Sequence, residues 1–87
     1  MNFEIERMAI VSTGHLPQTE LQALQTAPDY LPILRDDYGV TVFTHCQRPE
    51  HTPYANDILQ AASDDGIEWV KFDCDGPIYD EFPTFDW

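Results

Sequence analysis

Two clusters of polar residues contain side chains that commonly bind metal ions. His45, Cys46 and His51 occur in one polar stretch with Glu50 between them, and imidazole, thiolate and carboxylate groups are the usual ligands of zinc. The paired Cys-x-x-Cys or His-x-x-x-His spacings of zinc sites are absent here. We therefore predict that this stretch is a polar loop ahead of a helix, without a bound metal.

The second cluster has three carboxylates, Asp73, Asp75 and Asp80, around the glycine of an Asp75-Gly76-Pro77 sequence. Calcium loops also place carboxylates around a glycine, but they need glycine at the sixth position and glutamate at the twelfth. This segment has neither. We interpret it as a turn in which the Asp75 side chain caps its own backbone.

A third candidate is Ser12-Thr13-Gly14-His15, between an apolar run and a predicted helix. Proteins of the α/β class often bind anions or place nucleophiles there, but the glycine pattern of a phosphate loop or a nucleophile elbow is missing. We expect His15 to be structural, bonded to this turn or to the C-terminal segment. A reactive thiolate at Cys46 would need positive surroundings, which four Lys and Arg residues scarcely supply. The sequence predicts no catalytic residue, metal or cofactor.

The strongest signal is the excess of carboxylates. The 87 residues include 16 Asp and Glu against 4 Lys and Arg, a formal net charge of −12 at pH 7. The composition is 43% hydrophobic and 13% aromatic, which distinguishes this chain from a disordered acidic tail. Direct binding to nucleic acid or to anionic membranes is disfavoured, because both need Lys and Arg. The natural partner is a protein with a basic groove.

Carboxylates can imitate a row of phosphates when their spacing is regular. One helical turn separates side chains by about 5.4 Å and two strand residues by about 6.6 Å, while duplex DNA carries one charge per about 1.7 Å of axis. The alternative is an acidic surface that serves only solubility. The residues that we predict to contact a basic groove, called the acidic set below, are Asp57, Asp64, Asp65, Glu68, Asp73, Asp75, Asp80 and Glu81.

Two helices and about four strands must position these residues. Apolar and β-branched runs predict strands at 8–12, 40–44 and 67–73, a short strand at 78–79, and either an edge strand or an extended loop at 30–35. Helices are expected from Pro17 to Thr26, and from an N-cap at Thr52 to a stop at Gly66. Thr41 and Thr44 are expected to face water, and the indole of Trp87 to be buried. We predict one α/β domain over residues 1–87, with two helices packed on one face of a small mixed β-sheet.

No apolar run approaches the ~20 residues of a membrane span, and residues 1–7 lack the features of a secretory signal. We therefore expect two reduced cysteines and a cytoplasmic protein. A small sheet also leaves an edge strand that can pair with a second copy, so a homodimer is possible.

Two segments together carry a resemblance to known proteins. They are the Ser12-Thr13-Gly14-His15 turn and the ending that comprises Phe72-Asp73-Cys74-Asp75-Gly76-Pro77 and Phe82-Pro83-Thr84-Phe85-Asp86-Trp87. The combination resembles a family of small uncharacterised proteins of phages, plasmids and other mobile elements, over about residues 10–87. Accessory proteins of mobile DNA often counter host defence. In charge and size the chain is also similar to acidic inhibitors of CRISPR complexes and restriction enzymes, many of which imitate DNA.

The leading hypothesis is a non-enzymatic inhibitor of a host nucleic-acid-binding defence complex, of the anti-CRISPR or anti-restriction type, acting in the host cytoplasm through the acidic set. One alternative is a protein–protein interaction module that uses an aromatic face formed by Tyr30, Tyr38, Tyr54 and Tyr79. A less favoured alternative is a small metal-dependent or hydrolytic enzyme built on His15, His45, Cys46 and Asp75.

Overall fold

The described part of the chain contains seven elements, at positions that the apolar runs and turn formers indicate. The computed structural model describes residues 1–27, 33–45, 48 and 50–87. In chain order the elements are β1 (Met8–Ser12), the 3-10 helix η1 (Thr13–His15), α1 (Gln18–Gln25), β2 (Ile33–Asp36), β3 (Gly39–Phe43), α2 (Pro53–Asp64) and β4 (Trp69–Asp73). None of the helices in these described stretches has the length and apolar character needed to cross a membrane.

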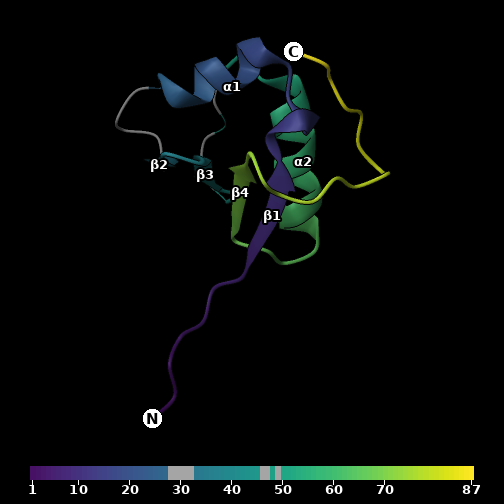
Figure 1. Cartoon of the computed structure of the whole chain (residues 1–87). Coiled ribbons are helices and arrows are strands. Elements are labelled where there is room, and N and C mark those ends of the chain that lie inside the picture. The colour runs from purple at the N-terminus through teal and green to yellow at the C-terminus, as the bar shows by residue number, and fades with distance from the viewer. Residues whose placement is uncertain (28–32, 46–47, 49) are drawn as a thin grey trace.

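The four strands form one mixed sheet in the order β1-β4-β3-β2. β1 and β4 are parallel, although about sixty residues separate them in sequence, and the other two pairs are antiparallel. α1 connects the two edge strands, β1 and β2, whereas α2 connects the antiparallel neighbours β3 and β4. The predicted α/β class with a small mixed sheet is therefore confirmed (Figure 1).

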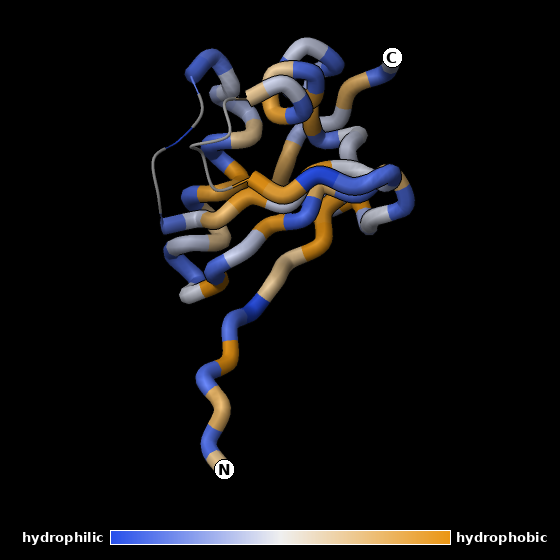
Figure 2. Tube along the Cα trace, turned by 90° about the vertical axis from the view of Figure 1, so that its left-hand side faces the viewer, coloured by the Kyte–Doolittle hydropathy of each residue, from blue (hydrophilic) through white to orange (hydrophobic). Residues whose placement is uncertain are grey.

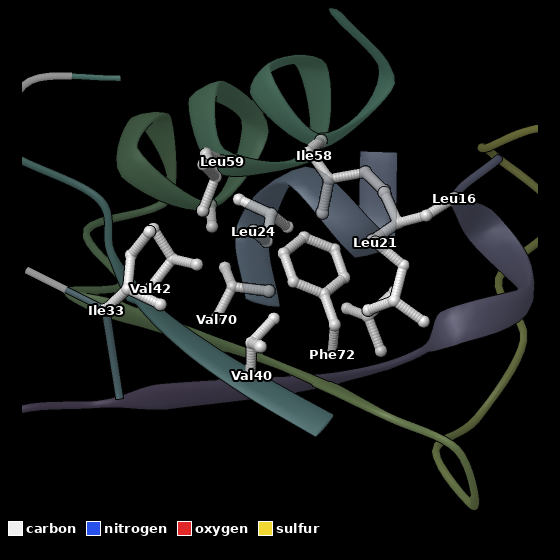
Figure 3. Packing of buried hydrophobic residues seen from close by; sticks show 13 residues of the cluster. Leu16, Leu21, Leu24, Ile33, Val40, Val42, Ile58, Leu59, Val70 and Phe72 are labelled. Carbon is white, nitrogen blue, oxygen red and sulfur yellow. The ribbon is translucent and has the colours of Figure 1, made fainter. Parts of the chain in front are cut away.

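The hydrophobic core lies between the sheet and both helices, which cover the same face (Figure 3). β-strand side chains alternate between the two faces of a sheet, and the inward positions here are apolar. Burial of these side chains, at about 25 cal/mol per Å² of apolar surface, is the main term that holds the two layers together. The labelled core residues are Leu16, Leu21, Leu24, Ile33, Val40, Val42, Ile58, Leu59, Val70 and Phe72.

None of the helices in the described ranges covers the opposite face of the sheet (Figure 3). The strand register places Ile10, Lys71, Thr41 and Leu34 in one row across this face. Ile10 is 44% exposed, Leu34 is 62% exposed and Met8 is 50% exposed. The uncovered face therefore carries apolar side chains in contact with solvent.

Residues 1–7 extend away from the body of the protein, with polar and apolar side chains in alternation (Figure 2). The large side chains of Phe3 and Ile5 are exposed. Contact with the body begins at the end of this segment, where Glu6 Oε1 accepts a hydrogen bond of 3.1 Å from the indole of Trp69.

Several local expectations were wrong because tertiary contacts outweigh the sequence pattern. Thr41 and Thr44 are buried rather than solvent-facing, and the Thr44 hydroxyl donates to the carbonyl of Ile67 over 2.6 Å. Pro17 is the N-cap of α1 and not its first residue. Residues 78–79 form no strand.

Two other expectations concern chain segments with proline or tryptophan. The sequence of segment 30–35 is compatible with an edge strand or an extended loop. Its described part belongs to the edge strand β2, while residues 30–32 lie outside the described ranges. The indole of Trp87 is not buried as expected but 56% exposed. Its ring nitrogen donates to the Leu16 carbonyl over 2.8 Å, which docks the C-terminal residue against the end of η1.

Candidate functional site

The C-terminal segment, residues 74–87, lies along the edge strand β1 and is fastened to it and to η1 (Figure 1). The Ser12 amide donates to the Pro77 carbonyl over 2.9 Å, and the Phe85 amide donates to the Gly14 carbonyl over 2.8 Å. The Tyr79 hydroxyl donates to the Ile10 carbonyl over 3.0 Å. An irregular segment thus crosses the edge strand β1 and is bonded to the end of β1 and to η1.

The buried side chain of His15 is hydrogen-bonded to the C-terminal segment at two places. Its side chain is fully buried, and its Nδ1 lies 2.8 Å from the Pro83 carbonyl oxygen, which can only accept. The other ring nitrogen, Nε2, accepts from the Tyr79 amide over 2.8 Å. The expectation that His15 contacts the C-terminal segment is confirmed, and because both nitrogens are occupied, this ring has no free nitrogen for a metal or a proton transfer.

A groove of about 490 Å³ lies between α2 and the C-terminal segment. Its floor is formed by β1 and β4, one wall by α2, and the other wall by residues 79–82. Nine of its eleven lining residues are apolar or aromatic, and the two exceptions are carboxylates, Asp65 on the helix wall and Glu81 on the segment wall. The sequence analysis did not predict this groove.

Six members of the acidic set lie on α2, at its end or on the C-terminal segment, namely Asp57, Asp64, Asp65, Asp75, Asp80 and Glu81. Asp57, Ala61 and Asp65 are spaced four residues apart and so share one side of the helix, and the latter two line the groove. Asp64, the last residue of α2, accepts from the Gln60 amide over 2.9 Å. Asp80 adjoins Glu81 in the opposite wall, and both side chains are exposed.

The two remaining members of the acidic set outside the C-terminal segment, Glu68 and Asp73, lie just before β4 and at its end. Glu68 precedes β4, and its Oε2 accepts from the Arg7 amide over 2.7 Å. That bond lowers the pKa of Glu68, more strongly than partial desolvation raises it. Asp73 is the last residue of β4 and Asp75 lies in the turn that follows it, at the other end of the strand from Glu68.

Asp73 takes part in a small ionic network at that end of the sheet. Lys71 Nζ lies 3.3 Å from the Asp73 carboxylate and 3.5 Å from that of Asp36. The hydrogen bond with Asp73 is the main cause that raises the pKa of Lys71. Asp73 Oδ1 also accepts from the Asp75 amide over 2.8 Å. The turn after β4 is therefore capped by Asp73, and the expectation that Asp75 caps it was wrong.

The basic residues leave the acidic surface largely uncompensated. Each of the three arginines donates to backbone carbonyls rather than to a carboxylate: Arg7 to Asp65 and Gly66, Arg35 to Ala27, and Arg48 to Thr44. Within the described residues, Lys71 is the single Lys or Arg that forms an ion pair. The carboxylates of Asp57, Asp65, Asp75, Asp80 and Glu81 form no hydrogen bond or ion pair with the part of the chain that the structure describes.

Among the described residues, His45, Glu50 and His51 are not part of a group of side chains close enough to hold one metal ion. The Oγ of Ser63, near the end of α2, lies 3.2 Å from His45 Nδ1, whereas His51 precedes the start of α2 and lies 3.9 Å from Glu50. Cys46 lies outside the described residues. One group with ligand atoms within 4.8 Å of one another occurs among the described residues, namely Asp73, Cys74 and Asp75.

Glu20 has a role that its sequence position concealed. Glu20 lies in the first turn of α1, where it would complement the dipole of its own helix, but its buried carboxylate accepts from the amides of Tyr54 and Ala55 at the start of α2, over 3.2 and 2.9 Å. Thr52 occupies the predicted N-cap position, yet its side chain makes no cap bond. One helix thus caps the other, and no local pattern signals such a contact.

The predicted aromatic face is not assembled from its tyrosines. Tyr38 lies in the turn before β3, Tyr54 contacts the ring of Phe85, and Tyr79 lies beside β1, while Tyr30 falls outside the described ranges. Aromatic rings do meet on the uncovered sheet face, where Phe43 and Trp69 pack edge to face with centroids 4.8 Å apart.

These features define a small α/β domain with an uncompensated acidic surface and an apolar groove beneath its C-terminal segment. The chain belongs to the family described as "Family of unknown function (DUF5983) C-terminal domain", whose model matches residues 8–87. No curated protein and no solved structure matches it.

Proposed function

We propose that this protein is a non-enzymatic inhibitor of a host nucleic-acid-binding defence complex, of the anti-CRISPR or anti-restriction type. It is a product of phage or other mobile DNA, acts in the host cytoplasm, and occupies a basic groove that otherwise receives DNA. The observation that carries this proposal is the excess of exposed negative charge: the net charge is −12, and the exposed carboxylates of Asp57, Asp65, Asp80 and Glu81 form no ion pair with the described residues.

The carboxylates on α2 and on the segment beside it are the centre of the proposed contact. Asp57 and Asp65 are eight residues apart, so they are separated by about 12 Å along the helix axis at about 1.5 Å per residue. Glu81 adds a third charge from the opposite wall of the groove. Such an array attracts Lys and Arg side chains from a distance and accelerates association. Asp73 and Glu68 contribute less, because each already serves a contact within the fold.

The test is competition with DNA. A purified CRISPR surveillance complex and a purified restriction endonuclease are each titrated with the protein, at several salt concentrations, with and without their duplex DNA. We expect binding to weaken as salt rises and DNA to exclude the protein from at least one of them. Binding that is indifferent to both salt and DNA would contradict the proposal.

Charge-matched variants separate the array from net charge. The triple variant Asp57→Asn, Asp65→Asn, Glu81→Gln removes three charges at the groove, and the control Glu4→Gln, Asp37→Asn, Asp86→Asn removes three exposed charges elsewhere. We expect the first to lose inhibition and the second to retain most of it. Equal losses would indicate a general charge effect and not an organised ligand.

A second candidate function is favoured by the uncovered face of the sheet. Met8, Ile10 and Leu34 are exposed there beside the Phe43–Trp69 pair, and exposed apolar patches commonly mark protein interfaces. Under this alternative the partner binds the sheet. The double variant Ile10→Thr, Leu34→Ser would then abolish binding, whereas the groove variants would leave it intact.

A further inference from the structure

We propose that the groove between α2 and the C-terminal segment binds an extended segment of the partner protein in which apolar and basic side chains alternate. This inference rests on the proposed function and deepens it, because it names the chemistry of the bound segment. It follows from three properties of the groove: its apolar floor, its paired carboxylates and its prebuilt wall.

The floor accepts apolar groups because small residues face one another across it. Ala9 on β1 and Ala61 and Ala62 on α2 line the space, where larger side chains would close the contact between helix and sheet. The resulting volume of about 490 Å³ is within the range of about 300–1,000 Å³ that is typical of ligand sites. Most of the lining has no group for hydrogen bonding, so the matching part of the ligand is apolar.

The charges of the two walls require a cationic ligand. Asp65 and Glu81 stand on opposite walls, both exposed and both without an ion pair to the described residues. Arg7 is near Asp65, but its guanidinium is directed to the backbone carbonyls of Asp65 and Gly66. Arg and Lys combine an apolar stem with a charged head, and a net charge of −12 repels anionic ligands.

The segment wall is built before any ligand binds. His15 fixes it at two points through Tyr79 and Pro83, and the Phe82 ring packs edge-on against the imidazole with centroids 5.9 Å apart. The Tyr79 hydroxyl holds the same stretch against β1. A preformed site avoids the entropy of ordering a loop upon binding, so a short peptide is sufficient as a probe.

The experiment uses three synthetic hexapeptides and the amide resonances of the whole protein. One peptide alternates Arg and Leu, one alternates Arg and Ser, and one alternates Glu and Leu. We expect the Arg–Leu peptide to shift the amides of Ala61, Asp65 and Tyr79 with a dissociation constant below about 1 mM. The other two peptides should bind at least about tenfold more weakly. Absence of these shifts, or equal binding of the Arg–Ser or Glu–Leu peptide, would overturn the inference.

A groove-filling variant gives an independent control. Ala61→Leu keeps a strong helix former but places a larger side chain in the groove, while Ala23→Leu makes the same change on α1, outside the lining. We expect the first variant to weaken Arg–Leu binding at least about tenfold and the second to leave it unchanged. Unchanged binding in Ala61→Leu would overturn the groove as the site.

The two proposals fail separately. If the Arg–Leu peptide binds the groove but DNA does not compete with the protein on any purified complex, the inhibitor function is wrong and the peptide site stands. If DNA competes but Ala61→Leu retains full inhibition and full peptide binding, the acidic surface acts without the groove.

Discussion

Replacement of His15 by alanine should release the C-terminal segment and leave the sheet folded. The imidazole makes two hydrogen bonds to that segment, each with a net contribution of about 1 kcal/mol. The loss of a fully buried ring adds about 1–2 kcal/mol of lost packing, less than for a rigid core site because the segment can move away. The sum is about 3 kcal/mol, below the 5–15 kcal/mol that typically stabilises a domain.

Native-state hydrogen exchange measures this effect at a residue that His15 does not touch. The Phe85 amide is bonded to the Gly14 carbonyl, so its protection reports whether the segment is docked. About 3 kcal/mol corresponds to an acceleration of about 100-fold, while the Phe72 amide in the centre of the sheet should change less. The variant His15→Asn, which can restore a donor near Pro83, should recover part of the protection. Exchange of Phe85 within about threefold of the wild-type rate in His15→Ala would refute the reasoning.

Three further substitutions test how the fold is held together. Glu20→Ala removes the buried cap of α2 and should cost about 2–4 kcal/mol; an unchanged urea midpoint would argue against the interhelical cap. Glu68 has a lowered pKa through the Arg7 amide, so the stability that it contributes is present above the ordinary value of 4.5 and lost as pH falls through the folded-state value. The difference in urea midpoint between wild type and Glu68→Gln should therefore shrink on acidification from neutral pH, and a constant difference would exclude this linkage. Gly39→Ala places a Cβ only 1.7 Å from the Phe72 carbonyl oxygen, which should separate β3 from β4 and cost more than about 3 kcal/mol; a well-folded variant would show that the strands can shift.

The parts of the fold that sequence patterns predicted are those that local physics determines. β1 and β3 are apolar, β-branched runs, and α2 begins with a proline at its first position and stops before Gly66, which has a positive φ of 73°. These features act over a few residues, so they can be recognised in the amino-acid sequence. For the same reason, the predicted bounds of β1, β3 and α2 agree with those of the structure to within a few residues.

The remaining features depend on residues that are far apart in the chain. His15 could be assigned a structural role, but its partners Tyr79 and Pro83 lie 64 and 68 residues away. Glu20 caps a helix that begins more than thirty residues later. Thr44 is buried because the chain before β4 supplies its acceptors. None of these contacts leaves a periodic pattern.

The candidate site was predictable in its chemistry and not in its arrangement. The sequence places Asp57 on the second helix and Asp64 and Asp65 at its end, and the bounds of α2 agree with this, because helix position is a local property. The sequence did not reveal that the two acidic residues Glu68 and Asp73 serve contacts within the fold. The groove escaped prediction because alanines on a helix and a strand give no signal until the two elements face each other.

The salt dependence of binding to the target complex tests the central claim most directly. For an anionic ligand in a basic groove, the logarithm of the binding constant falls linearly with the logarithm of salt concentration, with a slope set by the number of charge contacts. We predict a steep slope for the wild-type protein and a clearly shallower one for the variant Asp57→Asn, Asp65→Asn, Glu81→Gln, with the control Glu4→Gln, Asp37→Asn, Asp86→Asn close to wild type. Identical slopes for all three proteins would contradict the claim that these carboxylates form the ligand.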